Sequence, residues 1–337
     1  MAGSQDFELA SAVAEAGALG SLPCAMWSPD RIREQVRAFR ARTTRPLNLN
    51  FFCHRAPEPD PARAQAWRAR LAPHYAELRV PDSEAPVPSR SPFDGALCEV
   101  VEELRPEVVS FHFGLPARPL LERVRAAGAK VFCSATTVAE ARQLEQEGCD
   151  VIIAQGAEAG GHRGMFLTDE VASQVGTFAL VPQVVDAVKV PVLAAGGIAD
   201  ARGVLAAIVL GASGVQIGSA YLRCRESKTN PLHRARLAHT RDDATQITNV
   251  FTGRPARSIV NRWVREEGPL SARAPAFPLA VAGLAPLRAA AEAQGSDDFT
   301  PLWAGQAVAL AKAESAADYT RSLWVETLER CERLRQD

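Results

Sequence analysis

A glycine-rich loop with a single histidine is the part of this chain best suited to chemistry. It runs from Gln155 to Gly164 with the sequence Gln-Gly-Ala-Glu-Ala-Gly-Gly-His-Arg-Gly, directly after the apolar run 149–154. Glycine lets a backbone lie close to a flat or phosphorylated ligand. The imidazole of His162 can act as a general base, donate a hydrogen bond to an anionic substrate, or do neither. Its glycine-rich setting argues against a structural role in the core.

Two later segments each combine a short apolar run with a glycine turn. Residues 190–198 read Val-Pro-Val-Leu-Ala-Ala-Gly-Gly-Ile, and residues 211–219 read Gly-Ala-Ser-Gly-Val-Gln-Ile-Gly-Ser. Backbone N–H groups at such turns hold a phosphate without any lysine, and the last two strands of a barrel commonly bind phosphate. Two adjacent turns favour a phosphate site over ordinary strand-to-helix connections. The candidate residues are Gly196, Gly197, Gln216, Ile217, Gly218 and Ser219.

Two side-chain amides, Asn50 and Gln155, are expected at strand ends. An amide both donates and accepts, which suits the edge of a flavin or a nucleobase. Either amide alone is as easily explained by a turn, but two at neighbouring rim positions favour a heteroaromatic cofactor. His112, within Ser-Phe-His-Phe-Gly, fits a substrate pocket and a core position equally well. The sequence has no His-Glu-x-x-His motif, His/Cys cluster or carboxylate pair, so we expect no metal. The Gly-x-Gly-x-x-Gly fingerprint for binding a dinucleotide is also absent.

Alternating strands and helices must position these residues. Short runs rich in β-branched residues alternate with helices of about ten residues, which predicts parallel β-α-β units. Seven strands are expected, at 19–22, 46–52, 107–112, 130–134, 149–154, 191–195 and 214–217. A (β/α)8 barrel has eight strands, and the missing one is the first. We therefore predict a TIM barrel that lacks strand 1.

We expect two parts along the chain. Residues 1–220 form the barrel, and residues 221–337 form a mostly helical elaboration packed on it, with helices at 283–294, 301–312 and 316–335. A helix at 61–78 carries arginines that are most simply a solvated face. Prolines in the segment 80–92 predict an irregular connection, which is typical of a lid.

Composition narrows the class of protein. The chain has 337 residues, of which 47% are hydrophobic and 23% charged, as in a soluble globular protein. The net charge of −1 gives no reason to expect nucleic acid or a membrane surface as partner. Seven cysteines without C-x-x-C spacing, and no signal or membrane-spanning segment, predict reduced thiols in a cytoplasmic protein. The oligomeric state, monomer or homodimer, stays open.

Several of these segments together resemble the nitronate monooxygenases, formerly called 2-nitropropane dioxygenases. They are the loop 155–164, Ala-Gly-Gly-Ile at 195–198 and Gln-Ile-Gly-Ser at 216–219. Leu-Asn-Leu-Asn-Phe-Phe at 47–52 and Ser-Phe-His-Phe-Gly at 110–114 are similar to motifs of the class I branch. The resemblance implies a TIM barrel that binds FMN without a metal. It further implies oxidation of alkyl nitronates, such as propionate 3-nitronate, by O2 to oxo compounds and nitrite or nitrate.

The resemblance also assigns residues by position. It implies catalytic roles for His162, near the flavin N5, and for His112, as a second pocket histidine. The cofactor-binding residues it implies are Asn50, Gln155, Gly160, Gly161, Gly196, Gly197, Gln216, Ile217, Gly218 and Ser219.

Two alternative functions remain. Quinone reductases and FMN-type enoyl-acyl-carrier-protein reductases, which use NAD(P)H, share the glycine-rich histidine loop on the same scaffold. A barrel without strand 1 is also compatible with a non-catalytic flavin-binding remnant. Relatives have a first strand ending in Pro-Met-Ala-Gly, which Met1-Ala2-Gly3 matches in part. Either the true start lies upstream of Met1, or the strand is lacking. The second case puts flavin binding in doubt. We expect the 1–337 chain to be less stable, or to hold less flavin, than a version extended upstream by about ten residues, roughly one strand and its turn.

Overall fold

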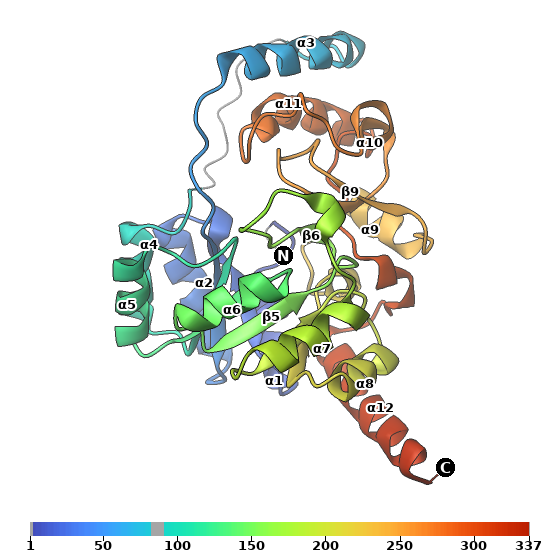
Figure 1. The fold of residues 1–337 in the computed structure, drawn as a ribbon. Coiled ribbons are helices and arrows are strands. Elements are labelled where there is room, and N and C mark those ends of the chain that lie inside the picture. The colour runs from blue at the N-terminus through green and yellow to red at the C-terminus, as the bar shows by residue number, and fades with distance from the viewer. Residues whose placement is uncertain (1–2, 82–90, 337) are drawn as a thin grey trace.

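The computed structural model describes residues 3–81 and 91–336. Seven parallel strands form one sheet in the order β1-β2-β3-β4-β5-β7-β8, curled into a half-barrel with helices around it (Figure 1). All seven predicted strands are confirmed. Among the described residues, β1 and β8 are the two edges of this sheet. The strands are β1 (Gly20–Pro23), β2 (Leu47–Phe52), β3 (Val108–His112), β4 (Lys130–Ala135), β5 (Val151–Gln155), β7 (Val192–Ala195) and β8 (Gly214–Gln216).

Helices between the strands cover the outer face of this sheet. They are α1 (Phe7–Glu15), α2 (Pro29–Arg42), α4 (Gly95–Leu104), α5 (Arg118–Ala126), α6 (Val138–Gln146), α7 (Thr177–Ala187) and α8 (Ala201–Val209). In β2, Leu47, Leu49 and Phe51 alternate toward the helices and are fully buried. The residues between them, Asn48 and Asn50, point the other way and both donate to Ser110 Oγ, at 2.9 and 2.8 Å. The barrel interior is therefore polar where the site is expected.

A second, antiparallel sheet joins the histidine loop to the C-terminal part of the chain. Its strands are β6 (Gly161–His162), β9 (Thr245–Thr248) and β10 (Ala256–Ile259), in the order β6-β10-β9. Ala256 pairs with His162, and Arg257 pairs with Gly161. The C-terminal part thus holds the loop that carries the candidate catalytic histidine.

Helix α3 (Pro61–Glu77) packs on the C-terminal part rather than on the barrel. With α10 (Arg262–Glu267) and α11 (Ala280–Ala293) it encloses a second hydrophobic core that contains Trp67, Leu71, Trp263, Leu284 and Phe299. None of these residues belongs to the core under the barrel helices. Figure 1 shows α3 lying over α11 and α10, away from the half-barrel. A division of the chain at residue 220 would separate α3 from its packing partners.

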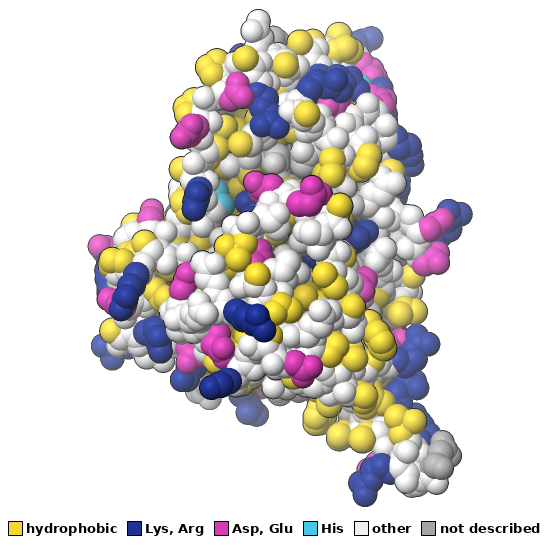
Figure 2. All heavy atoms as spheres, in the orientation of Figure 1, with side chains coloured by type: hydrophobic (Ala, Val, Ile, Leu, Met, Phe, Trp, Pro, Cys, Tyr) yellow, Lys and Arg dark blue, Asp and Glu magenta, His cyan; other side chains and the backbone are white. Residues whose placement is uncertain are grey.

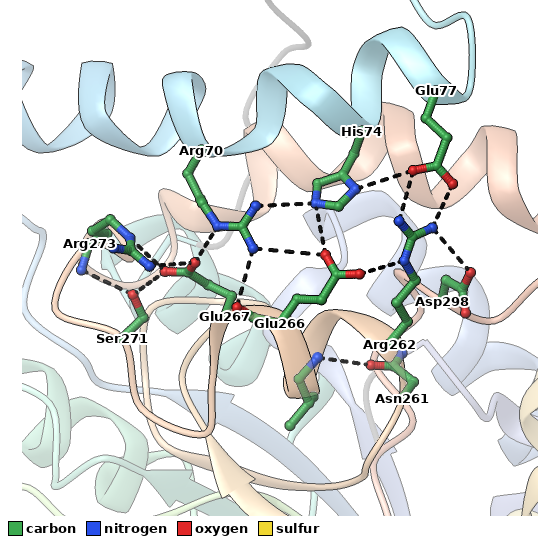
Figure 3. Close-up of polar contacts among 11 residues, drawn as sticks. Arg70, His74, Glu77, Asn261, Arg262, Glu266, Glu267, Ser271, Arg273 and Asp298 are labelled. Carbon is green, nitrogen blue, oxygen red and sulfur yellow. Dashed lines mark hydrogen bonds and ion pairs between the residues drawn. The ribbon is translucent and has the colours of Figure 1, made fainter.

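The sequence predicts a solvated polar face for α3. The structure shows instead that this face makes ion pairs with α10. Arg70 Nε donates to Glu267 Oε2 at 2.7 Å, His74 Nε2 lies 3.2 Å from Glu266, and Glu77 binds Arg262 at 2.6 Å (Figure 3). These contacts join α3 to α10 along about two turns of helix.

The helix predicted at 301–312 is wrong in its first half. Residues 301–305 are extended, and η4 (Gln306–Leu310) is a short 3-10 helix. The reason is pairing with β10: Ile259 N donates to Leu302 O at 2.9 Å, and Trp303 forms a bridge with Ser258. The other two predicted helices are present as α11 and α12 (Ala316–Gln336).

The surface carries both signs of charge. Figure 2 shows Lys and Arg side chains interspersed with Asp and Glu over the face it displays. No helix in residues 3–81 and 91–336 is long and apolar enough to cross a membrane. The predicted lid at 80–92 falls mostly outside the described residues.

Candidate active site

His162 lies where the half-barrel meets the C-terminal part. Its Nε2 is 2.9 Å from Thr252 Oγ1, in the turn between β9 and β10. Aromatic rings surround the imidazole, with centroid distances of 5.2 Å to Phe277, 5.3 Å to Trp303 and 5.9 Å to Phe113. The half-buried ring therefore has three aromatic neighbours and one hydroxyl partner.

His112, at the end of β3, holds the His162 backbone. Its Nε2 lies 3.1 Å from the carbonyl oxygen of His162, and its Nδ1 lies 3.0 Å from Ser134 Oγ. A carbonyl only accepts, so Nε2 carries the proton and Nδ1 accepts from the serine hydroxyl. Burial lowers the pKa of His112 to about 3, so the ring is neutral. Both nitrogens are occupied, which makes His112 a positioning residue in this arrangement.

The two candidate amides are used differently. Gln155 Oε1 accepts from Gly164 N at 2.7 Å, and its Nε2 donates to His162 O at 3.0 Å, so this side chain fixes the loop. Asn50 Nδ2 donates to Ser110, whereas no described residue donates to Asn50 Oδ1. Asn50 therefore presents an acceptor to a ligand more directly than Gln155 does.

Two fully buried charged side chains shape the loop on either side of His162. Arg163 donates to Gly156 O at 2.7 Å and to Gln155 O at 2.8 Å. Glu140 of α6 accepts from Phe166 N at 2.7 Å and from Thr136 N at 2.6 Å. Burial lowers the pKa of Arg163 to about 10, which still leaves it charged at neutral pH. The hydrogen bonds of these two side chains therefore fix the conformation of the glycine-rich loop, although its glycines alone would permit many conformations.

A cavity of about 100 Å³ lies at the ends of β7 and β8. Its lining brings together seven of the predicted cofactor-binding residues: Gln155, Gly160, Gly196, Gly197, Gln216, Gly218 and Ser219. Gly196 and Gly197 have φ of +108° and +70°, a conformation that other residues rarely adopt. The carboxylate of Glu158 is turned away from this cavity, toward Thr177 N at 2.8 Å.

The cavity fits an anion. The backbone N–H groups of Gly197, Gly218 and Ser219 make no hydrogen bond among the described residues. Unpaired backbone N–H groups in the residues that line a small cavity can bind a phosphate without a cationic side chain.

The other predicted cofactor-binding residues lie outside this cavity. Ile217 packs in a hydrophobic cluster with residues of α8 and α12, and Gly161 is part of the β6–β10 pairing. Asn50 lies within β2, two residues before its end, rather than at the strand end as predicted. Among the described residues, no group of three or more His, Cys, Asp or Glu could hold a metal ion.

The C-terminal part supplies site residues that sequence reasoning missed. Thr252, Phe277 and Trp303 contact the His162 ring, and Gly305 lines the cavity. A Cβ on Gly160 would lie 2.4 Å from Gly305 N, so that glycine is required by the close approach of the C-terminal part. The sequence offered one signal, the Thr-Gly-Arg-Pro turn at 252–255.

The fold and the site define a (β/α)-barrel enzyme with its site at the strand ends, where a glycine-lined anion cavity adjoins an enclosed histidine. A sequence model described as nitronate monooxygenase matches residues 1–326. The nitronate monooxygenase of Paraburkholderia phytofirmans is 39% identical over 339 residues, covering 100% of this chain and 93% of the relative. The chain belongs to the nitronate monooxygenase family, a family of flavin-dependent oxidoreductases, as its motifs predicted.

Solved structures agree with this assignment. The nitroalkane oxidase from Streptomyces ansochromogenes superimposes with a TM-score of 0.90 at 36% identity, covering 99% of this chain and 95% of that one. FabK from Thermotoga maritima gives a TM-score of 0.71 at 26% identity, covering 100% and 93%. The predicted fold class is therefore confirmed.

Proposed function

We propose that this protein binds FMN and uses it to oxidise alkyl nitronates, such as propionate 3-nitronate, with O2 to oxo compounds and nitrite or nitrate. The observation that carries the proposal is the enclosed His162 beside the cavity lined by Gly197, Gly218 and Ser219. When bound, the flavin supplies the acceptor for the electrons of the nitronate.

The residues present fit FMN. Its phosphate dianion would accept hydrogen bonds from the unpaired N–H groups of Gly197, Gly218 and Ser219. Asn50 Oδ1 would accept from a ring N–H of the isoalloxazine. An anion cavity of about 100 Å³ suits one phosphate, which favours FMN over FAD.

The chain's own groups then orient the substrate. The imidazole of His162 would position the anionic nitronate, and it would take a proton from carbon when a neutral nitroalkane arrives instead. Phe113, Phe277 and Trp303 would exclude water from this exchange. His112 and Gln155 would hold the His162 backbone in place.

The experiment has two parts, both on the purified full chain. Flavin released by denaturation is identified by chromatography, and O2 uptake is then followed with propionate 3-nitronate. FMN and nitronate-dependent O2 uptake are expected.

The competing function is an NAD(P)H-dependent reductase on the same scaffold. Rapid NADH oxidation with a quinone, without O2 uptake on nitronate, would transfer the assignment to that function. Protein without flavin, and without uptake after FMN is added, would favour a non-catalytic role.

A further inference from the structure

Arg254 is a cation beside the candidate site that lacks a carboxylate partner. It lies in the connection between β9 and β10 and is partly buried. Its Nη2 donates to Met165 O, whereas its Nε is buried without a hydrogen-bond partner among the described residues. The guanidinium therefore keeps donors that are not used within the described part of the chain.

The carboxylates that attract Arg254 do so from a distance. They are Asp169 and Glu140, and neither makes a hydrogen bond with its guanidinium. Asp169 is exposed, and Glu140 accepts from Phe166 N and Thr136 N instead. Burial lowers the pKa of Arg254 below its ordinary value, although an arginine stays charged in a protein. A partly desolvated charge without a partner costs free energy, which a bound anion would recover.

The guanidinium has a fixed place. Its Cζ lies over the Phe113 ring, 4.0 Å from the centroid. Phe113 has φ of +73°, a left-handed conformation that a bulky residue rarely adopts. Gly253, which precedes Arg254, has φ of +87°, and a Cβ there would lie 2.0 Å from Pro275 O. Strained backbone of this kind persists where its surroundings determine it, and it is frequent at ligand sites.

Phe113 also relates Arg254 to the candidate catalytic histidine. The centroids of the Phe113 and His162 rings are 5.9 Å apart, so Arg254 Cζ lies within about 10 Å of the His162 ring. Arg254 and Phe113 line one cavity together with Phe277, whose ring is 5.2 Å from the imidazole. A small substrate that reaches His162 is therefore within reach of Arg254.

We propose that Arg254 is a specificity-determining residue that binds a second anionic group of the substrate, so that the protein prefers nitronates that carry a carboxylate. This inference rests on the proposed function and names the substrate class of the same site. A planar guanidinium suits a carboxylate, because two of its N–H groups can donate to the two oxygens at once. In propionate 3-nitronate, two carbon atoms separate the nitrogen from the carboxyl group. With a hydrogen bond of about 2.9 Å at each end, such a molecule can contact both His162 and Arg254.

The test compares two nitronates of equal chain length on the flavin-loaded enzyme. Propionate 3-nitronate carries the carboxylate, and propyl nitronate has a methyl group in its place. Arg254→Met removes the charge and keeps an apolar chain over Phe113, whereas Arg254→Lys keeps the charge without the planar fork. Arg118→Met is the matched control, because Arg118 lines the same cavity but is 88% exposed and pairs with Glu122.

We expect Arg254→Met to raise KM for propionate 3-nitronate and to lower kcat/KM by about 10- to 100-fold, with propyl nitronate within about threefold of the wild type. Arg118→Met should behave like the wild type. An unchanged kcat/KM for propionate 3-nitronate, or equal losses on both nitronates, would overturn the proposal. If Arg254→Met does not fold, Arg254→Lys makes the same comparison, with a selective loss of about 3- to 10-fold expected; equal rates or equal losses there would also overturn it.

A second measurement does not depend on turnover. Succinate is an unreactive analogue of propionate 3-nitronate in which a carboxylate replaces the nitronate, and calorimetry gives its Kd. We expect binding about 10-fold weaker in Arg254→Met and unchanged in Arg118→Met; the same Kd in Arg254→Met as in the wild type would overturn the proposal. A wild type that binds succinate through Arg254 but oxidises no nitronate would instead contradict the proposed function, so the two failures are distinguishable.

Discussion

His112 Nε2 donates to the carbonyl oxygen of His162 at 3.1 Å, and this bond joins the end of β3 to the histidine loop that follows β5. The same oxygen accepts from Gln155 Nε2 at 3.0 Å. Strands β3 and β5 therefore both hold one backbone atom of the histidine loop. The sequence left open a role for His112 in the substrate pocket. In this arrangement His112 positions the backbone of His162.

The lowered pKa of His112 predicts a pH dependence of stability. Its pKa is about 3 in the folded protein and about 6.5 in an unfolded chain. Below about pH 6.5 the unfolded chain binds a proton that the folded protein does not, so stability is full above that pH and falls as the pH approaches 3. His112→Gln removes the titration and keeps a donor. We expect its Tm to fall less than that of the wild type between about pH 7 and pH 5.

The control for this experiment is His239→Gln, at an exposed position after α9 (Pro231–Ala238). Its Tm should follow the wild-type slope. If the Tm of His112→Gln decreases with falling pH as steeply as that of the wild type, the assignment of His112 as a buried neutral group is contradicted.

His162→Asn separates two uses of the imidazole. Asparagine keeps a hydrogen-bond donor and removes the base, so we expect most activity on neutral nitroalkanes to be lost and a substantial part on nitronates to remain. Steady-state O2 uptake with each substrate, normalised to bound flavin, measures the difference. Equal losses on both substrates would show that His162 does not act as the base.

Gly197→Asp tests the anion cavity. A Cβ on Gly197 would lie 3.5 Å from Glu158 Cβ, so the new carboxylate would add a second negative charge beside Glu158 at a residue of the cavity lining, which disfavours a bound phosphate; φ of +70° adds backbone strain of about 1 kcal/mol. We expect the purified variant to lack stoichiometric FMN. Gly128→Asp has the same kind of strain, with φ of +94° and no atom within 4 Å of a Cβ, and should keep its flavin. Full flavin content in Gly197→Asp would place the phosphate elsewhere.

Glu267→Gln tests the attachment of α3. The Glu267 side chain is 0% exposed and accepts from Arg70, Ser271 and Arg273 (Figure 3). Burial alone would raise the pKa of Glu267, but these hydrogen bonds outweigh it and hold the pKa below its usual value. Removing the charge weakens the hydrogen bonds to two guanidinium groups that are themselves partly exposed, so we expect a loss of about 1 kcal/mol in the stability of this part.

Hydrogen exchange measures this change, with faster exchange expected in α3 and α10 and little change in β2–β5. Glu122→Gln, which breaks the exposed pair with Arg118, is the control and should have almost no effect. Exchange in α3 at the wild-type rate would show that apolar packing alone holds the helix.

The features that the sequence could predict are those encoded by short local patterns of residues. The seven strands follow from short β-branched runs between turns, and His162, Gly197 and Gly218 follow from motifs within ten residues of a strand end. Thr252 and Trp303 could not be found in this way, because each reaches the site through pairing with β6 or β10 over long sequence distances. The extended segment 301–305 was predicted as helix because its alanine-rich surroundings favour helix, whereas tertiary pairing with β10 decided its conformation.

The position of α3 in the chain has a consequence for the order in which the protein can be assembled on the ribosome. Trp67 Nε1 donates to Ala280 O, which follows it by 213 residues. Most of the half-barrel can form as it emerges, but Trp67 and Leu71 then wait, without their apolar partners, until α10, α11 and Phe299 have been synthesised. Phe277 and Trp303, which contact the His162 ring, belong to the same late part of the chain. The nascent chain therefore gains its second core and the surroundings of His162 together, near the end of translation.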